Sequence, residues 1–258
     1  MGFGNDFLKK YQRLQYGIMF DDLIDLDFAS IGYSNTDQSS FWNLALVNKV
    51  LNDKEITKIE EILENFKRKS TIYFENRHEL EALSASLKAK GYKLGYEDTW
   101  QFWKGYKIDE AGFDLVKKVE TPEMLSDFLS TFDACYQKND PQNPYGELGE
   151  YLKVAESAWY KHQKSNRLEY FIVYKDKKAV AVSTLTNFEG IGYISNVGSL
   201  REVRGEGFGK LATLFCVASS VKNGNLEHCL ATEEGAYPNE FYMRIGFETR
   251  FTAVGYTK

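Results

Sequence analysis

The sequence predicts an α/β (α+β) protein, and three observations support this class. Alternating apolar residues, as in residues 191–197, have the period of a strand. Residues 211–221 instead repeat apolar side chains at the spacing of one helical face. A strand at 191–197 passes into that helix through a loop rich in glycine, so strands and helices alternate along the chain.

Length and composition are those of an ordinary globular protein. With 258 residues, 43% of them hydrophobic, the chain can bury a substantial core in one large domain or two smaller ones. No run approaches the roughly 18 to 20 apolar residues of a membrane span, and the amino terminus lacks a basic segment followed by an apolar one. We therefore expect a cytoplasmic protein with no membrane partner.

Charge and cysteine usage narrow the function classes further. The formal net charge is -5 and no long basic run is present, so we expect no nucleic-acid partner. Cys135, Cys216 and Cys229 are odd in number and lack metal-ligand spacing, which predicts buried free thiols and no metal site. For His228, on the strand after the loop helix, we expect a structural role.

Residues 1–110 are expected to form a domain of their own. It opens with a helical segment and contains strands at 70–74 and, rich in aromatic residues, at 99–103. Apolar residues at helical spacing predict two helices, with Ile56, Ile59, Leu63 and Phe66 on one face of the first and Leu80, Leu83 and Leu87 on one face of the second. A polar stretch at 107–112 is the expected boundary.

The second domain is expected at residues 113–258. It begins with a strand and a helix that Thr121 caps and Pro122 opens. A polar turn at 139–144 separates this helix from a second one, and a β-hairpin that turns at 175–178 comes next. The strand, loop and helix described above follow, and then one more strand, a short helix and a closing strand.

The loop between the strand and its helix carries Gly205, Gly207 and Gly209. Glycine lets the backbone come close to a ligand, and the first turn of a helix presents unpaired N–H groups at the positive end of its dipole. Arg204 and Lys210 flank the glycines and add positive charge. The loop therefore predicts a cradle for a diphosphate.

Two familiar glycine loops do not fit this stretch. A Walker loop needs a glycine where Arg204 stands and a serine or threonine where Leu211 stands. The dinucleotide fingerprint needs Gly-x-Gly-x-x-Gly directly after a strand, whereas the spacing here is Gly-x-Gly-x-Gly. The sequence favours neither.

The pattern that fits is Arg-x-x-Gly-x-Gly, formed by Arg204, Gly207 and Gly209 and preceded by Val197-Gly198-Ser199. It resembles the acyl-coenzyme A loop of the GNAT superfamily of N-acyltransferases, in which many members have Val-Gly-Thr-x-Pro-Glu-x-Arg-Gly-x-Gly. Here Ser199 replaces the threonine and Arg201 the proline. The resemblance implies acetyl-coenzyme A (acetyl-CoA) as co-substrate, bound by Val197, Gly198, Ser199, Arg204, Gly205, Glu206, Gly207, Phe208, Gly209, Lys210 and Asn239.

A second motif lies one strand further on. Phe241, Tyr242, Gly246 and Phe247 resemble the closing signature of the same family, Phe-Tyr-x-x-x-Gly-Phe, whose short helix lies across the thioester. The resemblance implies that Tyr242 is the catalytic general acid for the departing thiolate. A phenol with a pKa near 10 stays protonated at neutral pH, as that role requires.

For residues 113–258 the resemblance implies a GNAT fold, with a central mixed, mostly antiparallel sheet flanked by helices. Gly91-Tyr92 before a strand parallels Gly246-Phe247, which suggests a tandem of two GNAT-like domains. The first would be a degenerate copy without a coenzyme site, with Leu87 in the place of Tyr242. Helix, glycine, aromatic residue and strand is also a common ending, so the pattern alone leaves an unrelated first domain open.

The function implied is an N-acetyltransferase that moves the acetyl group from acetyl-CoA to a primary amine of a small-molecule or peptide acceptor. The amine attacks directly within a ternary complex, and N–H groups near Val197 and Gly198 stabilise the oxyanion. Glu233 and Glu189 are candidates for the general base. Two alternatives stay open, a tandem-GNAT transferase that uses aminoacyl-tRNA and a non-catalytic acyl-CoA-binding module.

Overall fold

The computed structural model describes residues 3–258, which fold into two compact units. The first unit consists of the chain up to Trp100 together with Arg250–Lys258, and the second consists of Gln101–Thr249. Both units combine helices with a sheet, as the sequence predicts.

The limits of these units differ from the expected domains, 1–110 and 113–258. Strand β5 (Lys93–Trp103) begins in the first unit and ends in the second. Strand β11 (Phe247–Thr257) begins in the second and ends in the first. Because two strands belong to both units, one cut along the sequence does not separate them.

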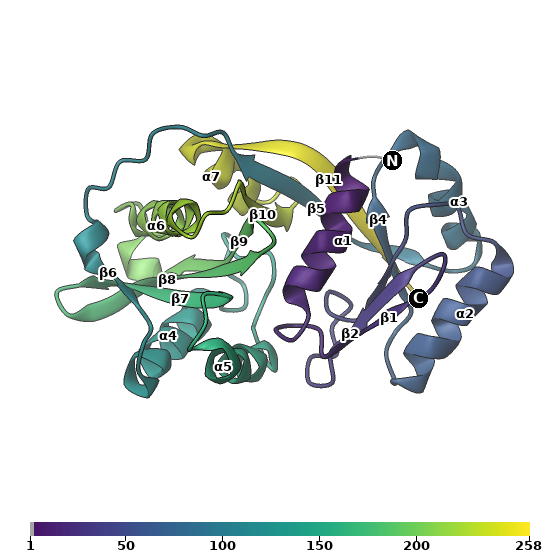
Figure 1. Cartoon of the computed structure of the whole chain (residues 1–258), viewed down its shortest axis with the longest axis horizontal. Helices are drawn as coiled ribbons and strands as arrows, with labels where there is room; N and C mark the ends of the chain where they lie inside the picture. The colour runs from purple at the N-terminus through teal and green to yellow at the C-terminus, as the bar shows by residue number, and fades with distance from the viewer. Residues whose placement is uncertain (1–2) are drawn as a thin grey trace. The chain divides into compact units, whose positions relative to one another are not determined.

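The first unit begins with a helix and contains a sheet whose strands two further helices connect (Figure 1). Besides β5 and the end of β11, its elements are α1 (Phe3–Gln15), β1 (Asp22–Asp25), β2 (Ser30–Tyr33), β3 (Leu44–Leu46), α2 (Asp53–Asn65), β4 (Thr71–Glu75), a 3-10 helix (His78–Leu80) and α3 (Glu81–Ala89). The strand order is β1-β2-β3-β4-β11-β5. Strands β1, β2 and β3 form an antiparallel meander, and β4 is parallel to β3 and antiparallel to β11.

Strand β4 divides the core of this unit into two layers. Ile72 and Phe74 belong to the apolar cluster formed with α2 and α3. Tyr73, between them, points to the other face, where its hydroxyl accepts a hydrogen bond of 3.0 Å from the Trp100 indole. The ring of Phe7 from α1 contacts Trp100 at 5.3 Å between centroids. Helices therefore cover both faces of the strand.

The second unit is built on a mixed, mostly antiparallel sheet flanked by helices, as predicted. Its elements are a 3-10 helix (Phe113–Leu115), β6 (Val116–Lys118), α4 (Pro122–Cys135), α5 (Tyr151–His162), β7 (Leu168–Lys175), β8 (Lys178–Phe188), β9 (Ile191–Ser199), a 3-10 helix (Arg201–Val203), α6 (Phe208–Lys222), β10 (Glu227–Glu233) and α7 (Tyr237–Ile245). The strand order is β5-β10-β9-β8-β7-β6. Pairs from β6 to β9 are antiparallel, and β9 and β10 are parallel. Helix α6 covers one face, and α4 and α5 cover the other (Figure 1).

The two units repeat one order of elements. Three antiparallel strands are followed by a helix, a parallel strand, a second helix and a long strand, as β1-β2-β3-α2-β4-α3-β5 and as β7-β8-β9-α6-β10-α7-β11. Both second helices end at a left-handed glycine, Gly91 with φ 87° and Gly246 with φ 119°. A buried aromatic residue, Tyr92 or Phe247, follows each glycine. The expected tandem is therefore present in the topology.

Helix α6 buries most of the expected apolar face, but not its last residue. Leu214 belongs to the core, and Leu211 and Phe215 pack against it, as expected for the apolar face of residues 211–221. Val221 of the same face is 54% exposed, whereas Cys216 and Val217 are fully buried. Small side chains line the buried face, and a Cβ added at Gly192 of β9 would lie 2.7 Å from the Cβ of Ser220. The sheet thus selects the face that allows close approach, while the large Phe215 packs at the edge against Phe113.

Candidate functional site

The strand that precedes the glycine loop is bent and separates from its neighbour. The β8–β9 register shifts between Val182 and Thr184, and Asn196, within the bulge, has the left-handed φ of 53°. Among the described residues, the parallel pairing of β9 with β10 ends at Tyr193 and Cys229. From that point β9 changes from buried to half-buried residues. The last third of β9, which contains three of the predicted coenzyme ligands, therefore leaves one edge without β10.

Tyr136, directly after α4, and Tyr151, the first residue of α5, hold this bulge in place. The Tyr151 hydroxyl donates to Asn196 Oδ1 at 2.9 Å, and the Asn196 amide donates to Thr184 Oγ1 at 3.1 Å. The Tyr136 hydroxyl donates to the main-chain oxygen of Val197 at 3.2 Å. A Cβ at Gly198 would lie 2.6 Å from the Cβ of Cys135 on α4, so this glycine permits the helix to approach.

The glycine loop leaves the first turn of α6 open. Gly205 and Gly207 have φ of 84° and 92°, which favours glycine, and in the described part of the chain a Cβ at either would meet no atom within 4 Å. Gly207 occupies the N-cap position and has no side chain to accept the first N–H groups of the helix. Helix α6 therefore begins with N–H groups, next to open space, that an anion can occupy.

The charges around this loop are largely balanced within the protein. Arg204 forms two hydrogen bonds to the Asp140 carboxylate, at 2.8 and 2.7 Å, and this guanidinium lowers the pKa of Asp140. Glu206 is paired with Lys175 at 2.6 Å. Lys210, in the first turn of α6, is exposed to solvent. Of the predicted flanking charges, Lys210 is thus better placed than Arg204 to meet a phosphate.

Helix α7 brings the second motif to the same region. An added Cβ on Gly209 would lie 3.7 Å from the ring of Phe241, so α7 packs beside the first turn of α6. Tyr242 is 8% exposed, and its hydroxyl makes no hydrogen bond to any residue that the structure describes. Burial raises the pKa of Tyr242 above its usual value, so the phenol stays protonated at neutral pH and is a weaker acid than an exposed tyrosine.

Asn239 is buried in the first turn of α7 with an unsatisfied donor. Its main-chain oxygen accepts from the Gln101 amide at 3.1 Å. Its own Nδ2 is buried and has no hydrogen-bond partner among the described residues. A buried amide donor without a partner lowers the stability of the fold unless a ligand accepts its hydrogen bond. Because the pantetheine arm of coenzyme A carries two amide carbonyls, the Asn239 donor and the open α6 terminus fit the chemistry of that molecule.

The two candidate bases are differently placed. Glu233 ends β10 and is half-buried, and its main-chain N–H donates to the Tyr145 hydroxyl at 3.2 Å. Glu189 is exposed in the turn that precedes β9. The nine residues of β9 span about 30 Å and separate it from the glycine loop. The geometry therefore favours Glu233 over Glu189.

The thiols and His228 have structural surroundings. All three cysteines are buried and free, as predicted. Burial raises the pKa of Cys135 and of Cys216 to about 12, so both stay protonated at neutral pH. The Nδ1 atom of His228 is hydrogen-bonded to the Ser220 hydroxyl at 2.7 Å, and burial lowers its pKa.

Metal-binding clusters and membrane-spanning helices are both absent from the described part of the chain. Within residues 3–258, no three His, Cys, Asp or Glu side chains are grouped so as to hold a metal ion. Nor does any helix in that range have the length and apolar character needed to cross a membrane.

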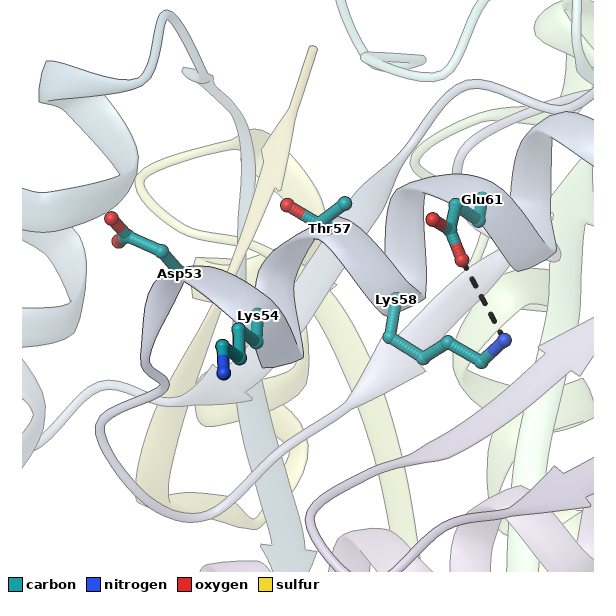
Figure 2. Close-up of a pocket in the computed structure, with 5 residues that line it drawn as sticks. All are labelled: Asp53, Lys54, Thr57, Lys58 and Glu61. Atoms are coloured by element: carbon teal, nitrogen blue, oxygen red, sulfur yellow. Dashed lines mark ion pairs between the residues drawn. The ribbon is translucent and has the colours of Figure 1, made fainter.

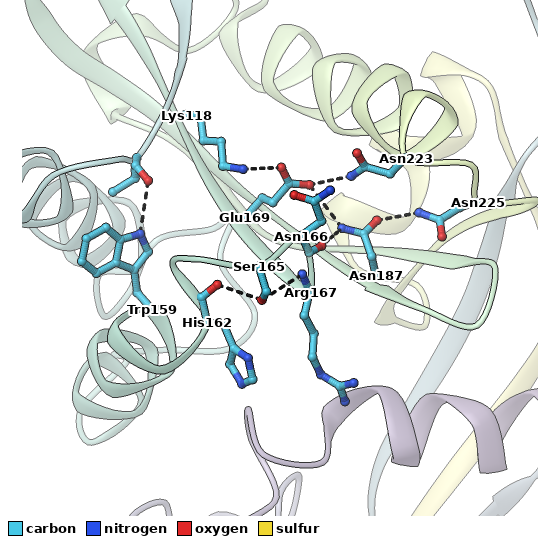
Figure 3. A network of polar contacts seen from close by, with 11 residues as sticks. Lys118, Trp159, His162, Ser165, Asn166, Arg167, Glu169, Asn187, Asn223 and Asn225 are labelled. Carbon is cyan, nitrogen blue, oxygen red and sulfur yellow. Dashed lines mark hydrogen bonds and ion pairs between the residues drawn. The ribbon is translucent and has the colours of Figure 1, made fainter.

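A second polar cluster in this unit is structural. Figure 3 shows Glu169 of β7, which accepts from Lys118 of β6 at 2.7 Å and from Asn223, after α6, at 2.6 Å. Asn187 of β8 donates to the same carboxylate at 3.2 Å. Since both carboxylate oxygens are satisfied, this cluster joins three strands to the end of α6 and leaves little capacity for a ligand.

The first unit contains a shallow hollow of a different kind. Figure 2 shows that it follows the outer face of α2 and is lined by Asp53, Lys54, Thr57, Lys58 and Glu61. Lys58 and Glu61 are paired at 3.6 Å, and both are more than half exposed. This mixture of opposite charges on one helix face is typical of a solvated surface.

Several residues of the site have no signature in the sequence. Asp140, Tyr145, Tyr151 and Asn196 each contact a group that lies 45 to 88 residues away in the sequence. Asn196 also makes one closer bond, to Thr184 of β8. Residues 139–144 appear in the sequence only as a polar turn between two helices. The two prolines around this turn, Pro141 and Pro144, are the one local sign of a fixed conformation.

Comparison with protein-family models gives no match, and a search of curated proteins also gives none. Solved structures do match. A GCN5-related N-acetyltransferase from Kribbella flavida has a TM-score of 0.68 and 16% identity, and the match covers 100% of this chain and 96% of that one. A functionally unknown conserved protein from Staphylococcus epidermidis ATCC 12228 has a TM-score of 0.65 and 14% identity, with 93% and 94% covered.

A tandem arrangement is also found among the similar structures. A tandem GNAT protein from the clavulanic acid biosynthesis pathway has a TM-score of 0.54 and 13% identity, with coverage of 90% of this chain and 78% of that one. At such identities the likeness concerns the fold. The predicted GNAT fold, with a second GNAT-like unit, is confirmed at that level.

Proposed function

We propose that this chain is an acyl-CoA-dependent N-acyltransferase, with acetyl-CoA as donor and a primary amine as acceptor. The observation that carries the proposal is the open N-terminus of α6 behind Gly205 and Gly207, next to a strand that separates from its neighbour after Tyr193. A diphosphate is the anion that such a terminus suits. The fold supports the same function class.

The residues of the second unit have distinct parts in binding. The N–H groups of the first turn of α6 would receive the diphosphate, and the exposed Lys210 would add charge. The unpaired Asn239 amide would donate to a carbonyl of the pantetheine arm. The bound co-substrate supplies an acyl carbonyl activated as a thioester and a thiolate leaving group.

In the reaction, a C–N bond to the acceptor forms and the C–S bond breaks. Main-chain N–H groups near Val197 and Gly198, where β9 lacks the β10 neighbour, would stabilise negative charge on the carbonyl oxygen. The Tyr242 hydroxyl, which makes no bond to a described residue, would donate its proton to the thiolate. Glu233, directly or through water, would take the proton that the amine loses. No covalent enzyme intermediate is needed.

The test is isothermal titration of acetyl-CoA against the wild type, Gly207→Glu and Gly224→Glu. Both glycines are exposed, have positive φ and have no atom of the described chain within 4 Å of an added Cβ. Both substitutions therefore bring the same charge and similar backbone strain, one at the start of α6 and one after its end. Thermal unfolding shows that each variant is folded.

We expect the wild type and Gly224→Glu to bind alike and Gly207→Glu to lose binding. Equal affinity of all three proteins would mean that acetyl-CoA does not bind at the glycine loop. Absence of binding to the wild type would refute the proposal and would turn attention to the aminoacyl-tRNA-dependent alternative. Binding would justify a screen of amine acceptors.

A further inference from the structure

The segment between α4 and α5, residues 136–150, contacts three parts of the site. At its start the Tyr136 hydroxyl donates to the Val197 oxygen of β9. Near its end the Tyr145 hydroxyl accepts from the main-chain N–H of Glu233, at the end of β10. Between them Asp140 binds Arg204 in the glycine loop. The 136–150 segment thus joins two strands that no longer pair with each other to the loop between β9 and α6.

The ion pair of Asp140 and Arg204 is mostly withdrawn from solvent. Its two hydrogen bonds are parallel, from Nη1 to Oδ1 at 2.8 Å and from Nη2 to Oδ2 at 2.7 Å. The side chains are 7% and 19% exposed. A bidentate pair fixes the orientation of both groups, and removal from water makes either charge costly without the other.

The segment itself is ordered around Asp140. The carboxylate also accepts from the Gln142 N–H at 3.0 Å, and the Asp140 main-chain oxygen accepts from the Asn143 N–H at 2.9 Å. The Asn143 amide donates to the Gly146 oxygen at 2.8 Å and its Oδ1 accepts from the Tyr145 N–H at 3.1 Å. These bonds hold Asp140 in place without help from a helix or strand.

We propose that Asp140 is a positioning residue for the diphosphate site, because it holds Arg204 and thereby fixes the glycine loop before the ligand binds. Arg204 then serves as a structural arm of the loop, with its charge balanced by Asp140. The diphosphate is received by the N–H groups of α6. This inference rests on the proposed function and assigns a part to a residue outside both sequence motifs.

The experiment is a double-mutant cycle on acetyl-CoA affinity with Asp140→Asn, Arg204→Gln and the combined variant. Asn keeps the shape of Asp and removes the charge. We expect each single variant to raise the Kd about 10- to 100-fold, because a displaced loop misaligns its N–H groups. The Kd of the double variant should be no higher than that of the single variant with the higher Kd, since the two residues act as one unit.

The control is Glu150→Gln, at the other end of the 136–150 segment. Glu150 pairs with Lys153 at 2.9 Å, and both side chains are more than half exposed. This variant removes a carboxylate from the same segment and should bind acetyl-CoA like the wild type. Thermal unfolding gives the transition temperature of each variant. Titration below that temperature keeps an effect on affinity separate from an effect on stability.

A shortened ligand separates positioning from general damage. S-acetylpantetheine ends before the diphosphate, and ligand-observed NMR at millimolar concentration measures its binding. We expect Asp140→Asn to weaken acetyl-CoA and to leave S-acetylpantetheine unchanged. Equal losses for both thioesters, additive effects in the cycle, or wild-type affinity of Asp140→Asn for acetyl-CoA would each overturn the positioning role. If the wild type fails to bind acetyl-CoA, the proposed function fails as well.

Discussion

The two units contain the same step from a strand to a helix, and the two steps end differently. In the second unit β9 leads to α6, whose N-cap is Gly207. In the first unit β3 leads to α2, whose N-cap Asn52 accepts from the Glu55 N–H at 3.0 Å, while the Glu55 carboxylate accepts from the Asn52 N–H at 2.9 Å. Asp53 adds a second negative charge to the first turn of α2.

This difference explains how one topology yields one candidate anion site. The capping box of α2 satisfies the N–H groups that an anion would use, and its carboxylates repel a phosphate. The start of α6 has neither feature, because Gly207 lacks a side chain and Lys210 occupies the position of Glu55. The topology therefore permits an anion site in both units, and the residues at the helix start favour α6 over α2.

The largest expected effect concerns the helix after the parallel strand, where Tyr242 of α7 corresponds to Leu87 of α3. Leu87 is fully buried, whereas the Tyr242 hydroxyl makes no hydrogen bond to a residue that the structure describes. We predict that Tyr242→Phe lowers kcat about 10²- to 10⁴-fold, because a general acid is lost. Steady-state kinetics with an amine found by screening measures this effect.

The affinity of the same variant supplies the control. Phe keeps the packing of the ring against Phe247, at 5.8 Å between centroids, so the Kd of acetyl-CoA should stay within about threefold of the wild type. A loss of affinity with unchanged kcat would instead identify Tyr242 as a binding residue. Retention of full activity would remove it from the proposed chemistry.

The residues that cap α2 can be introduced at the start of α6. Gly207→Asn with Lys210→Glu places the residue types of a capping box at the first turn of α6, with the spacing found at Asn52 and Glu55. We expect acetyl-CoA affinity to fall at least about 100-fold, since a carboxylate replaces the Lys210 ammonium beside the open N–H groups and the introduced asparagine supplies a side chain that competes for them once its backbone becomes extended like that of Asn52. Isothermal titration measures the loss.

The single variants separate the effect of the new N-cap side chain from the effect of the reversed charge. Asn tolerates the left-handed φ of 92° at position 207 better than other residues do, so Gly207→Asn should fold and retain part of the affinity. Lys210→Glu alone should show the contribution of charge. If the combined variant binds acetyl-CoA as the wild type does, the diphosphate does not occupy the start of α6.

The local parts of the fold and site are predictable from the sequence. The glycine loop, the 175–178 hairpin and the Gly246-Phe247 ending each depend on residues close together in the chain, and backbone preferences determine them. The expectation that Val221 of α6 is buried was wrong, because the burial of Val217 in its place depends on how closely the sheet approaches the helix. Such an approach has no periodic signal.

Long-range pairings explain what the sequence leaves out. Asp140 and Arg204 are 64 residues apart, and Tyr145 and Glu233 are 88 apart. The unit limits are set by β5 and β11, which lie at distant places in the chain and belong to both units. Contacts of this kind depend on the assembled sheet, and no single stretch of residues specifies them.

The capping box at the start of α2 stabilises the first unit and has no part in the proposed coenzyme site. Asn52→Ala removes a cap that serves α2 alone, so we predict a loss of about 1 kcal/mol in the free energy of unfolding. Acetyl-CoA affinity should not change, because α2 belongs to the first unit. Urea denaturation followed by circular dichroism measures the loss, and titration checks the affinity.

Glu55→Gln divides that stabilisation into charge and hydrogen bonding. The hydrogen bond from Lys49, and after it the Asn52 N–H, lower the pKa of Glu55 below its ordinary value near 4.5. A carboxylate with a lowered pKa in the folded state stabilises above its unfolded pKa, and this contribution disappears as the pH falls through the folded pKa. The variant should therefore be less stable than the wild type at pH 7, by at most about 0.5 kcal/mol for an exposed pair, and equally stable near pH 3. A deficit of the same size at both pH values would mean that the geometry of the capping box, and not its charge, closes the start of α2.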